Sequence, residues 1–465
     1  MKVFTGKIAN WPVVAVFAMF TAASSLGQAP QPFLQDIKVA APEGPSASAT
    51  PTVRKTSSSA AVTSPSASAV RTAYPILAET PIPGYSGVLV ETIGGQVVVE
   101  SSSNVPFNPA SNVKLATAFA ILKTFGPDYR FPTNVWTDGS YEEATSTIHG
   151  NLYISGRDPM FSYEHGVRLA SELNRMGIRI VKGDLVVTDN FSMNYQTSAS
   201  RSSQLLFASM DASKRNAAAV NAWKSYLVNS GRISQVTGDP SVSFTGSVYV
   251  QPMPGNVNLL FSHESAPMRD VLKATLNFSN NFLSERLGDM VGGPYAVARL
   301  VHQHAAVPPA EFSIQTSSGL GINRVTPSAM MKLLRALRGS LADYRMTFAD
   351  IMPVAGIDRG TLEHRFQSDF SMGSVVGKTG TLGRTDGGVS ALAGEISTRN
   401  GTLLFVIFNQ RGSVSRFRSF QNNYVSLIQG QFGGAAPMGY DKIPLNSRLA
   451  QTRIAFPSDR GSNGN

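Results

Sequence analysis

Short apolar runs separated by turn residues open the folded part of the chain. Residues 88–91 and 97–100 are rich in Val and flank the pair Gly94-Gly95, which predicts two strands joined by a tight turn. Two longer apolar runs, 389–396 and 403–409, lie on either side of Asn400-Gly401. Because Asn-Gly is a strong signal for a two-residue hairpin turn, these runs predict a second hairpin.

Helical patterns lie between and after these strands. Strong helix formers follow Pro109 and continue to Lys123, which predicts a largely buried helix. Apolar residues at helical spacing predict a second helix over 417–428 that packs on a sheet. Residues 152–189 read as a strand, a helix over 167–176 and a further strand at 185–188, which indicates a separate α/β subdomain.

The N-terminal segment has the layout of a secretory signal. Lys2 and Lys7 precede an apolar run over 11–23, which small residues follow up to Ala29. We therefore predict a cleavable signal peptide over 1–29 and export across a membrane. The alternative is an uncleaved anchor, but the run is shorter than the roughly 20 apolar residues of a comfortable span.

Composition then divides the rest of the chain. Residues 30–73 are dominated by Ala, Ser, Thr, Pro and Val, with few large apolar side chains, so we expect a disordered tether. Residues 433–465 look similarly loose and predict a flexible tail. The folded domain is expected over 74–432.

Overall composition and charge exclude several classes of function. The chain has 465 residues, 42% of them hydrophobic, which is enough for a sizeable core. It contains no cysteine, so disulfides, thiolate metal sites and a cysteine nucleophile are excluded. A net charge of +10 favours anionic surroundings, and export makes nucleic acid an unsuitable partner. An anionic cell envelope fits better.

The first chemical signal is the pair Ser111 and Lys114 at the start of the helix that follows Pro109. A spacing of three places both side chains on one helix face, where a neutral amine can take the proton of the hydroxyl. A desolvated, cation-rich pocket would lower the lysine pKa enough for this role. The alternative is an N-cap serine beside a solvated lysine.

Two further motifs follow in order along the chain. Ser279-Asn280-Asn281 offers a hydroxyl for proton relay and an amide for gripping substrate. The run from Lys378 to Thr381 reads Lys-Thr-Gly-Thr and precedes the Asn400-Gly401 hairpin. A cation and a hydroxyl on a strand suit a substrate carboxylate, and the glycine permits close backbone approach. The alternative for this run is an ordinary strand end.

In this order the three motifs resemble the signature of penicillin-binding proteins and class A β-lactamases. Four longer segments are similar to the D-alanyl-D-alanine carboxypeptidase/endopeptidase family of low-molecular-mass penicillin-binding proteins. They are residues 108–115, 150–159, 352–362 and 377–383. The resemblance implies an α+β, β-lactamase/penicillin-binding-protein-like transpeptidase fold, with an antiparallel sheet flanked by helices, a helical lobe and an α/β subdomain inserted at about 130–255.

The resemblance also implies a role for each motif residue. Ser111 would be the nucleophile that forms an acyl-enzyme, Lys114 the base that activates it, and Ser279 the relay that protonates the leaving amine. The backbone N–H groups of Ser111 and Thr381 would form the oxyanion hole.

Substrate-binding roles follow by the same resemblance. Asn281 would hold a substrate amide, and Lys378 with Thr379 would bind the terminal carboxylate. Asp189 occupies the position of an acidic insertion residue that in some relatives faces the amino-bearing end of the peptide. Its alternative is a turn or cap aspartate.

These expectations combine into one function. The chain would be an exported serine D-alanyl-D-alanine carboxypeptidase/endopeptidase that acts on peptidoglycan stem peptides and is acylated by β-lactams. No cofactor and no metal are expected, since the six histidines show no His-Glu-x-x-His pattern. The alternatives are a serine β-lactamase and a catalytically silent peptidoglycan-binding protein, the latter suggested by the unusual loop over 316–321.

Overall fold

The computed structural model describes residues 70–235, 238–368 and 371–457. The predicted signal peptide and nearly all of the predicted tether lie outside these ranges. None of the helices in the described ranges combines the length and the apolar character needed to cross a membrane.

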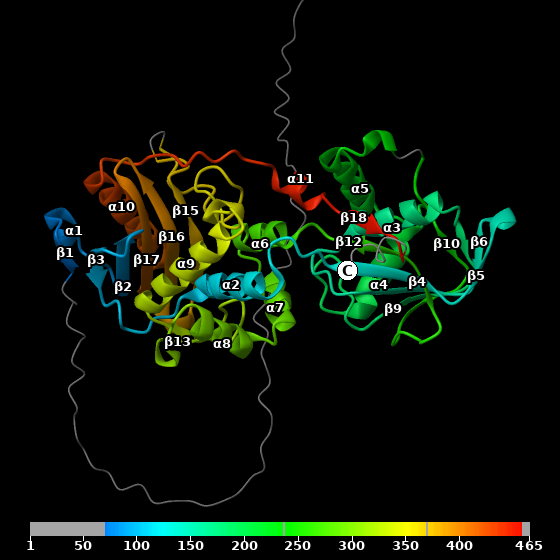
Figure 1. Cartoon of the computed structure of the whole chain (residues 1–465), viewed down its shortest axis with the longest axis horizontal. Helices are drawn as coiled ribbons and strands as arrows, with labels where there is room; N and C mark the ends of the chain where they lie inside the picture. Colours follow the sequence, from blue (N-terminus) through cyan, green and yellow to red (C-terminus); the bar gives the residue numbers. More distant parts are fainter. Residues whose placement is uncertain (1–69, 236–237, 369–370, 458–465) are drawn as a thin grey trace, which may run out of the picture. The chain divides into compact units, whose positions relative to one another are not determined.

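One antiparallel sheet organises the part of the chain that carries the motifs (Figure 1). Its strand order is β1 (Arg71–Thr72), β3 (Val97–Ser101), β2 (Tyr85–Thr92), β17 (Gly401–Gln410), β16 (Val389–Thr398) and β15 (Val375–Leu382). Both predicted hairpins are confirmed, because β2 pairs with β3 and β16 pairs with β17 across Asn400-Gly401. The Lys378 strand is β15, at the edge of this sheet.

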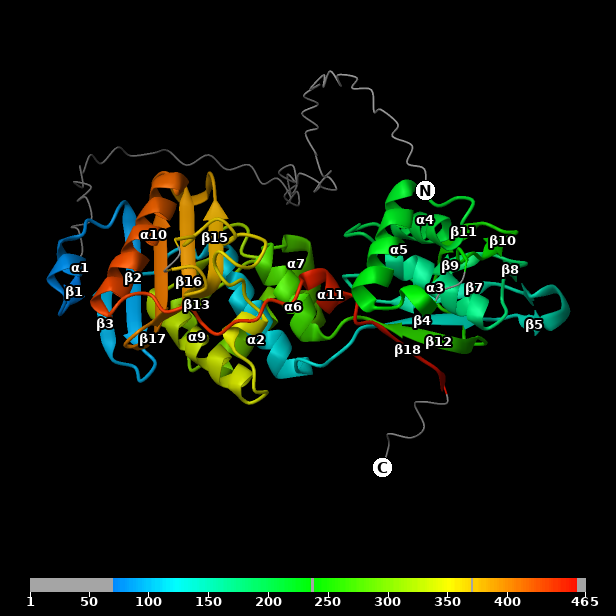
Figure 2. The ribbon, with the colours of Figure 1, turned by 90° about the horizontal axis from the view of Figure 1, so that it is seen from above.

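The side chains of β17 are buried on both faces of this sheet. Leu404, Val406 and Phe408 belong to one core cluster, while the alternating Leu403 and Phe405 belong to another. The first cluster is completed by helices α2 (Val113–Phe125) and α9 (Pro327–Ala342), and the second by α1 (Pro75–Glu79) and α10 (Val414–Gln431). Figure 2 shows α10 on one face of the sheet and α9 with α2 on the other. The alternation is the period-two pattern of a strand, here apolar on both sides.

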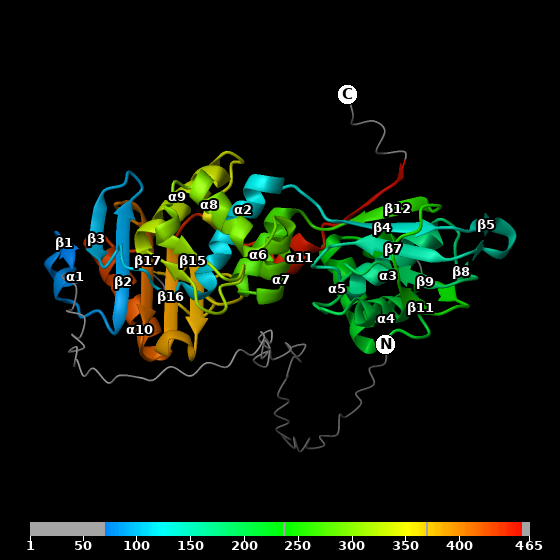
Figure 3. The same ribbon diagram turned by 90° about the horizontal axis from the view of Figure 1, so that it is seen from below.

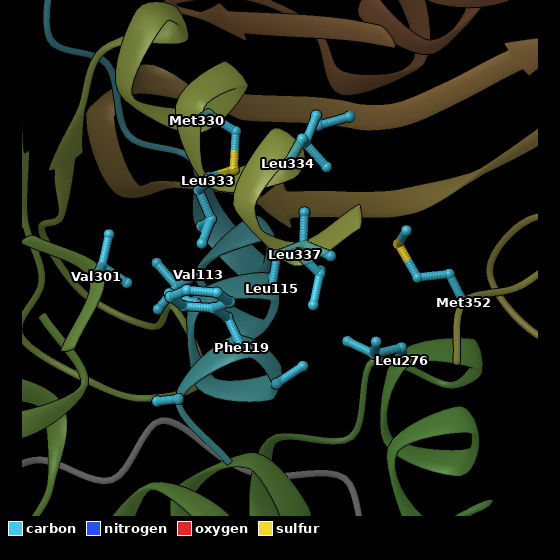
Figure 4. Packing of buried hydrophobic residues seen from close by; sticks show 14 of the residues in the cluster. Val113, Leu115, Phe119, Leu276, Val301, Met330, Leu333, Leu334, Leu337 and Met352 are labelled. Atoms are coloured by element: carbon cyan, nitrogen blue, oxygen red, sulfur yellow. The ribbon is translucent and has the colours of Figure 1, made fainter. Parts of the chain in front are cut away.

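Helix α2 lies at the centre of the larger cluster, and every residue from Val113 to Leu122 is buried. Around it pack α6 (Met268–Asn277), α7 (Asn281–Met290), α8 (Pro294–His304) and α9. Figure 4 shows Phe119 and Leu115 of α2 beside Leu337 of α9, with Leu276 of α6 nearby. Burial of each such side chain stabilises the fold by about 1.5–3 kcal/mol. Because these contacts surround α2, they fix the position of the helix.

The chain between α2 and α6, together with one strand near the C-terminus, builds two further sheets. One has the order β11 (Val248–Val250), β9 (Leu185–Val187), β7 (Leu152–Gly156), β4 (Pro132–Thr137), β12 (Asn258–Glu264) and β18 (Arg453–Ala455), and the other β10 (Ser243–Phe244), β8 (Ile180–Val181), β6 (Thr147–His149) and β5 (Ser140–Glu142). Helices α3 (Tyr163–Arg175), α4 (Ala199–Met210) and α5 (Ala217–Ser230) lie on one face of the first of these sheets (Figure 3). The strands expected near 152 and 185 and the helix between them are confirmed as β7, β9 and α3.

The C-terminal segment differs from the expected loose tail. It contains α11 (Leu445–Leu449) and β18, and β18 pairs antiparallel with β12. Arg448 of α11 also donates to the Asp270 carboxylate over 2.6 Å. The polar composition gave no sign of this order, which comes from pairing with β12, from the Arg448–Asp270 ion pair and from side chains such as Ala450 and Ile454 that pack against core clusters.

Candidate active site

Ser111 sits in a short 3-10 turn, Ala110–Asn112, that leads directly into α2. Ala110 has a φ of 47°, a left-handed conformation that is uncommon for alanine. Two glycines crowd this turn: a Cβ on Gly319 would lie 1.9 Å from the Ala110 carbonyl oxygen, and one on Gly380 would lie 2.6 Å from the Pro109 carbonyl oxygen. Only glycine allows these two segments to approach so closely, so the turn that carries Ser111 is held by backbone on two sides.

Lys114 lies one turn below Ser111 and is 1% exposed. Its Nζ is within hydrogen-bond distance of Ser111 Oγ at 3.0 Å, Asn281 Oδ1 at 2.7 Å and the Ser318 carbonyl oxygen at 2.6 Å. Burial lowers the pKa of Lys114 to about 7, against the opposing effect of the Glu285 carboxylate. A substantial fraction of Lys114 is therefore neutral near pH 7 and has a lone pair to accept the Ser111 proton.

Ser279 and Lys378 approach the same place from other elements. Ser279 occupies the bend between α6 and α7, with a φ of 54°. Lys378 of β15 is fully buried and donates to Ser279 Oγ over 2.8 Å and to the Thr379 carbonyl oxygen over 2.7 Å. Burial, reinforced by the charge of Lys114, holds the pKa of Lys378 well below its usual range. The motif hydroxyls Ser111 and Ser279 thus each contact a desolvated lysine.

A loop after Met352 holds the bend that carries Ser279. The Thr361 N–H donates to the Asn277 carbonyl oxygen over 2.9 Å at the end of α6. A Cβ on Gly360 would lie 2.2 Å from the same oxygen, so this contact also requires glycine. Lys273 of α6 forms a buried ion pair of 2.6 Å with Asp358 of the loop. The position of Ser279 therefore depends on residues more than 70 positions further along the chain.

A cavity of about 630 Å³ opens over these groups. Its lining includes the predicted site residues Ser111, Ser279, Asn281, Thr379 and Thr381, and also Leu320, Gly360, Thr361, His364, Arg365, Arg418, Ser419 and Asn422. Lys114 and Lys378 lie buried against the hydroxyls of this lining. The structure therefore brings seven of the eight predicted residues together.

Asp189 is the exception. It follows β9, is exposed, and lines a different cavity together with Asn134, Ser155 and Arg157. None of the motif residues lines that cavity. Its expected role toward the amino-bearing end of the peptide came from the resemblance alone and stays a prediction.

The sequence analysis missed Glu285, which positions a loop at the bottom of the site. Its carboxylate accepts the backbone N–H groups of Ser317 at 3.1 Å and Ser318 at 2.9 Å. It thereby fixes the loop whose Ser318 carbonyl contacts Lys114. The available signal was helical spacing, because Glu285 follows Asn281 by four positions and so lies on the same face of α7. Arg365 and Arg418 belong to no motif and had no comparable signal.

Acylation of Ser111 is expected to depend on pH through Lys114. With the neutral amine as the base that the resemblance implies, and the pKa of Lys114 lowered to about 7, the rate should fall about tenfold per pH unit below pH ~7 and level off above it. The measurement is the rate constant of acylation by a fluorescent penicillin between about pH 5 and about pH 9, with circular dichroism to verify folding throughout. A rate that still rises towards pH ~10, as an ordinary lysine would give, would contradict this assignment.

Comparison with known proteins identifies the family. The model of the D-Ala-D-Ala carboxypeptidase 3 (S13) family matches residues 76–222 and 211–428. The chain belongs to this family. Among similar proteins, a D-alanyl-D-alanine carboxypeptidase of Actinomadura sp. (strain R39) is 25% identical over 76% of this chain and 82% of its own length. A carboxypeptidase of Mycobacterium tuberculosis is 26% identical over 76% of this chain and 82% of its own length.

Solved structures give the same fold. A predatory peptidoglycan endopeptidase from Bdellovibrio bacteriovorus superposes with a TM-score of 0.65 at 22% identity, covering 78% of this chain and 97% of its own. Penicillin binding protein 4 from Haemophilus influenzae superposes with a TM-score of 0.55 at 20% identity, covering 76% and 97%. The expected α+β fold of the penicillin-binding-protein type is confirmed, as is the resemblance to the D-alanyl-D-alanine carboxypeptidase family of low-molecular-mass penicillin-binding proteins.

Proposed function

We propose that this S13 family member is an exported serine D-alanyl-D-alanine carboxypeptidase/endopeptidase that acts on peptidoglycan stem peptides through an acyl-enzyme on Ser111. The observation that carries the proposal is the contact of Ser111 Oγ with Lys114 Nζ at 3.0 Å, inside the cavity that Ser279 and Thr381 also line. The similarity to carboxypeptidases of Actinomadura and Mycobacterium tuberculosis supports it. Because the substrate lies outside the cytoplasm, the N-terminal signal pattern and a periplasmic or secreted location fit this function.

The chemistry follows from the contacts. Neutral Lys114 takes the proton of Ser111, and Oγ attacks the carbonyl carbon of the penultimate D-alanine. The backbone N–H groups of Ser111 and Thr381 stabilise the negative oxygen that forms. Ser279, in contact with Lys378, passes a proton to the leaving amine, the C–N bond breaks, and the terminal residue departs. Water then hydrolyses the ester and restores the Ser111 hydroxyl.

Substrate positioning uses the remaining motif residues. Asn281 Oδ1 lies 2.7 Å from Lys114 Nζ, so its Nδ2 group remains to donate to a substrate carbonyl. Thr379 and Thr381 line the cavity beside the buried amine of Lys378, and hydroxyl and amine donors suit the terminal carboxylate.

β-Lactams are expected to acylate Ser111 and to remain bound. One of the Bdellovibrio endopeptidase structures is in a penicillin G acylated form. A β-lactamase needs a base that activates water on the acyl-enzyme, yet none of the described residues that line the cavity is Asp or Glu. The nearby Glu285 carboxylate is occupied by two backbone N–H groups. This favours a peptidase over a β-lactamase.

Product analysis tests the function directly. The purified protein is expected to release D-alanine from a pentapeptide that ends in D-Ala-D-Ala, and to split a cross-linked muropeptide dimer, while the pentapeptide ending in L-Ala-L-Ala serves as the control. In parallel, intact-mass measurement should show a persistent penicillin adduct. Rapid penicillin hydrolysis without peptide cleavage would identify a β-lactamase. Muropeptide binding with neither adduct nor cleavage would identify a silent binding protein.

A further inference from the structure

The C-terminal segment returns to the catalytic half of the chain after α10. We call residues 436–448 the C-terminal strap. The Met438 N–H donates to the Gly373 carbonyl oxygen over 2.8 Å, and Lys442 Nζ donates to the Ile357 carbonyl oxygen over 2.5 Å. Both acceptors precede β15 in the chain. The strap therefore lies against the loop that supports the bend between α6 and α7.

Tyr440 of the strap contacts the buried ion pair of Lys273 and Asp358. Its hydroxyl donates to Asp358 Oδ1 over 3.1 Å, while Asp358 Oδ2 accepts from Lys273 over 2.6 Å. The centre of its ring lies 5.0 Å from Lys273 Nζ, within the range of cation–π attraction. Burial and the Asp358 carboxylate raise the pKa of Tyr440, so its hydroxyl keeps the proton that it donates. Tyr440 thus holds one oxygen of the carboxylate and covers the ammonium group that binds the other.

The ion pair connects the strap to the catalytic bend. Lys273 lies about one turn before Asn277, the last residue of α6, and Ser279 follows in the bend. The loop that carries Asp358 also donates the Thr361 N–H to the Asn277 carbonyl oxygen over 2.9 Å. A shift of this loop therefore moves the end of α6, and with it the Ser279 hydroxyl.

A cavity separates part of the strap from the bend. It has a volume of about 310 Å³ and is lined by Asn277, Phe278 and Arg359 on the side of the bend and by residues 442–446 on the side of the strap. Atoms on opposite sides of a cavity make no van der Waals contact, so the bend is positioned by hydrogen bonds rather than by packing across this space. The bond of the Tyr440 hydroxyl gains importance for that reason.

We propose that Tyr440 is a positioning residue for the Ser279 relay. Its hydroxyl and ring hold the Asp358–Lys273 pair in one arrangement, and the pair holds the end of α6 so that Ser279 Oγ lies where the leaving nitrogen receives its proton. Tyr440 is not among the described residues that line the active-site cavity, so it acts on the reaction through the bend. This inference rests on the proposed function and adds to it a residue that belongs to no motif.

The leaving group distinguishes this role from a general loss of structure. An amine leaves only with a proton, whereas a thiolate leaves without one. The experiment measures kcat/KM of the full protein on a D-Ala-D-Ala peptide and on the thioester with the same acyl part and D-2-mercaptopropionate as leaving group. We expect Tyr440→Phe to lose about 5- to 50-fold on the peptide and less than about twofold on the thioester. The control Tyr295→Phe changes a tyrosine of α8 that is 81% exposed and should behave as the wild type.

A double variant tests whether Tyr440 acts through Ser279. In a Ser279→Ala background the relay hydroxyl is missing, so Tyr440→Phe should change kcat/KM on the peptide by less than about twofold. The ring over Lys273 remains in Tyr440→Phe, and the melting temperature should fall by roughly 2–6 °C for the loss of one hydrogen bond to a carboxylate.

Three results would overturn the role of Tyr440: equal losses on peptide and thioester, no loss on the peptide, or an undiminished loss in the Ser279→Ala background. Penicillin separates this inference from the proposed function, because its ring nitrogen is also a leaving amine. A wild type that forms the penicillin adduct but releases no D-alanine would overturn only the peptidase function. Slower adduct formation in Tyr440→Phe would then uphold the inference, and an unchanged rate would overturn it. A wild type with neither adduct nor cleavage would overturn both.

Discussion

Ser111→Ala is expected to form no penicillin adduct and to release D-alanine from a D-Ala-D-Ala peptide at least about 10³-fold more slowly than the wild type. The reason is geometric, because Ser111 Oγ is the hydroxyl that contacts Lys114 Nζ, whereas Ser279 Oγ accepts from Lys378. Among the described residues, Ser111 is the one whose hydroxyl lies within hydrogen-bond distance of Lys114 Nζ. Adduct formation is measured by intact mass and D-alanine release by a coupled assay.

A matched control separates this effect from a general loss of folding. Ser415→Ala changes an exposed serine on α10 and should retain both the adduct and the peptidase rate. The melting temperature of Ser111→Ala should remain close to that of the wild type, because the substitution removes one hydroxyl from a partly exposed side chain. A persistent adduct on Ser111→Ala would show that another residue is acylated and would refute the acyl-enzyme assignment.

Asp358→Ala is expected to lower the free energy of unfolding by about 3–5 kcal/mol. The ion pair of Lys273 with Asp358 is nearly inaccessible, with side-chain exposures of 2% and 4%. Asp358 also accepts the Val354 N–H at 2.9 Å and the Tyr440 hydroxyl at 3.1 Å. Its removal leaves a buried ammonium group and two donors without their acceptor, which costs more than the pair itself contributes. Urea unfolding measures the change.

Two further variants make this prediction specific. Asp343→Ala removes an exposed aspartate that follows α9 and should change stability by less than about 0.5 kcal/mol. The double change Lys273→Met with Asp358→Leu replaces the pair by apolar groups and should recover much of the lost stability. If Asp358→Ala were as stable as the wild type, the buried pair would not hold the loop against α6. Because this loop supports the Ser279 bend, penicillin acylation should slow in Asp358→Ala as well.

Local patterns predicted much of this fold because they act over short distances. The apolar runs around Asn400-Gly401 specify β16 and β17, whose pairing register the turn sets directly. The helix after Pro109 and its Ser111 and Lys114 are likewise defined by propensity and spacing. The pairing of β18 with β12 was not predicted. A strand of three residues without an apolar pattern becomes ordered only when its partner strand is in place.

The candidate site also has features that local sequence predicts and features that depend on tertiary packing. Its motif residues could be predicted because each motif is a few residues long and carries its own chemistry. The lysine pKa values could not be predicted, because the burial that lowers them comes from segments hundreds of residues apart, such as the Ser318 loop over Lys114. The place of Arg418 was not readable either, because only the packing of α10 brings its guanidinium group to Thr381 of β15.

The sequence by itself determined the two hairpins of the main sheet, the helix that follows Pro109, the order of the three motifs and the family to which the chain belongs. Only the tertiary structure decided that two lysines lie desolvated beside two serines, that Glu285 fixes the loop beneath them, that two arginines face the cavity and that Asp189 does not. The physical reason is that short-range spacing depends on neighbours along the chain. Desolvation and charge imbalance depend instead on what packs against a residue from elsewhere in the fold.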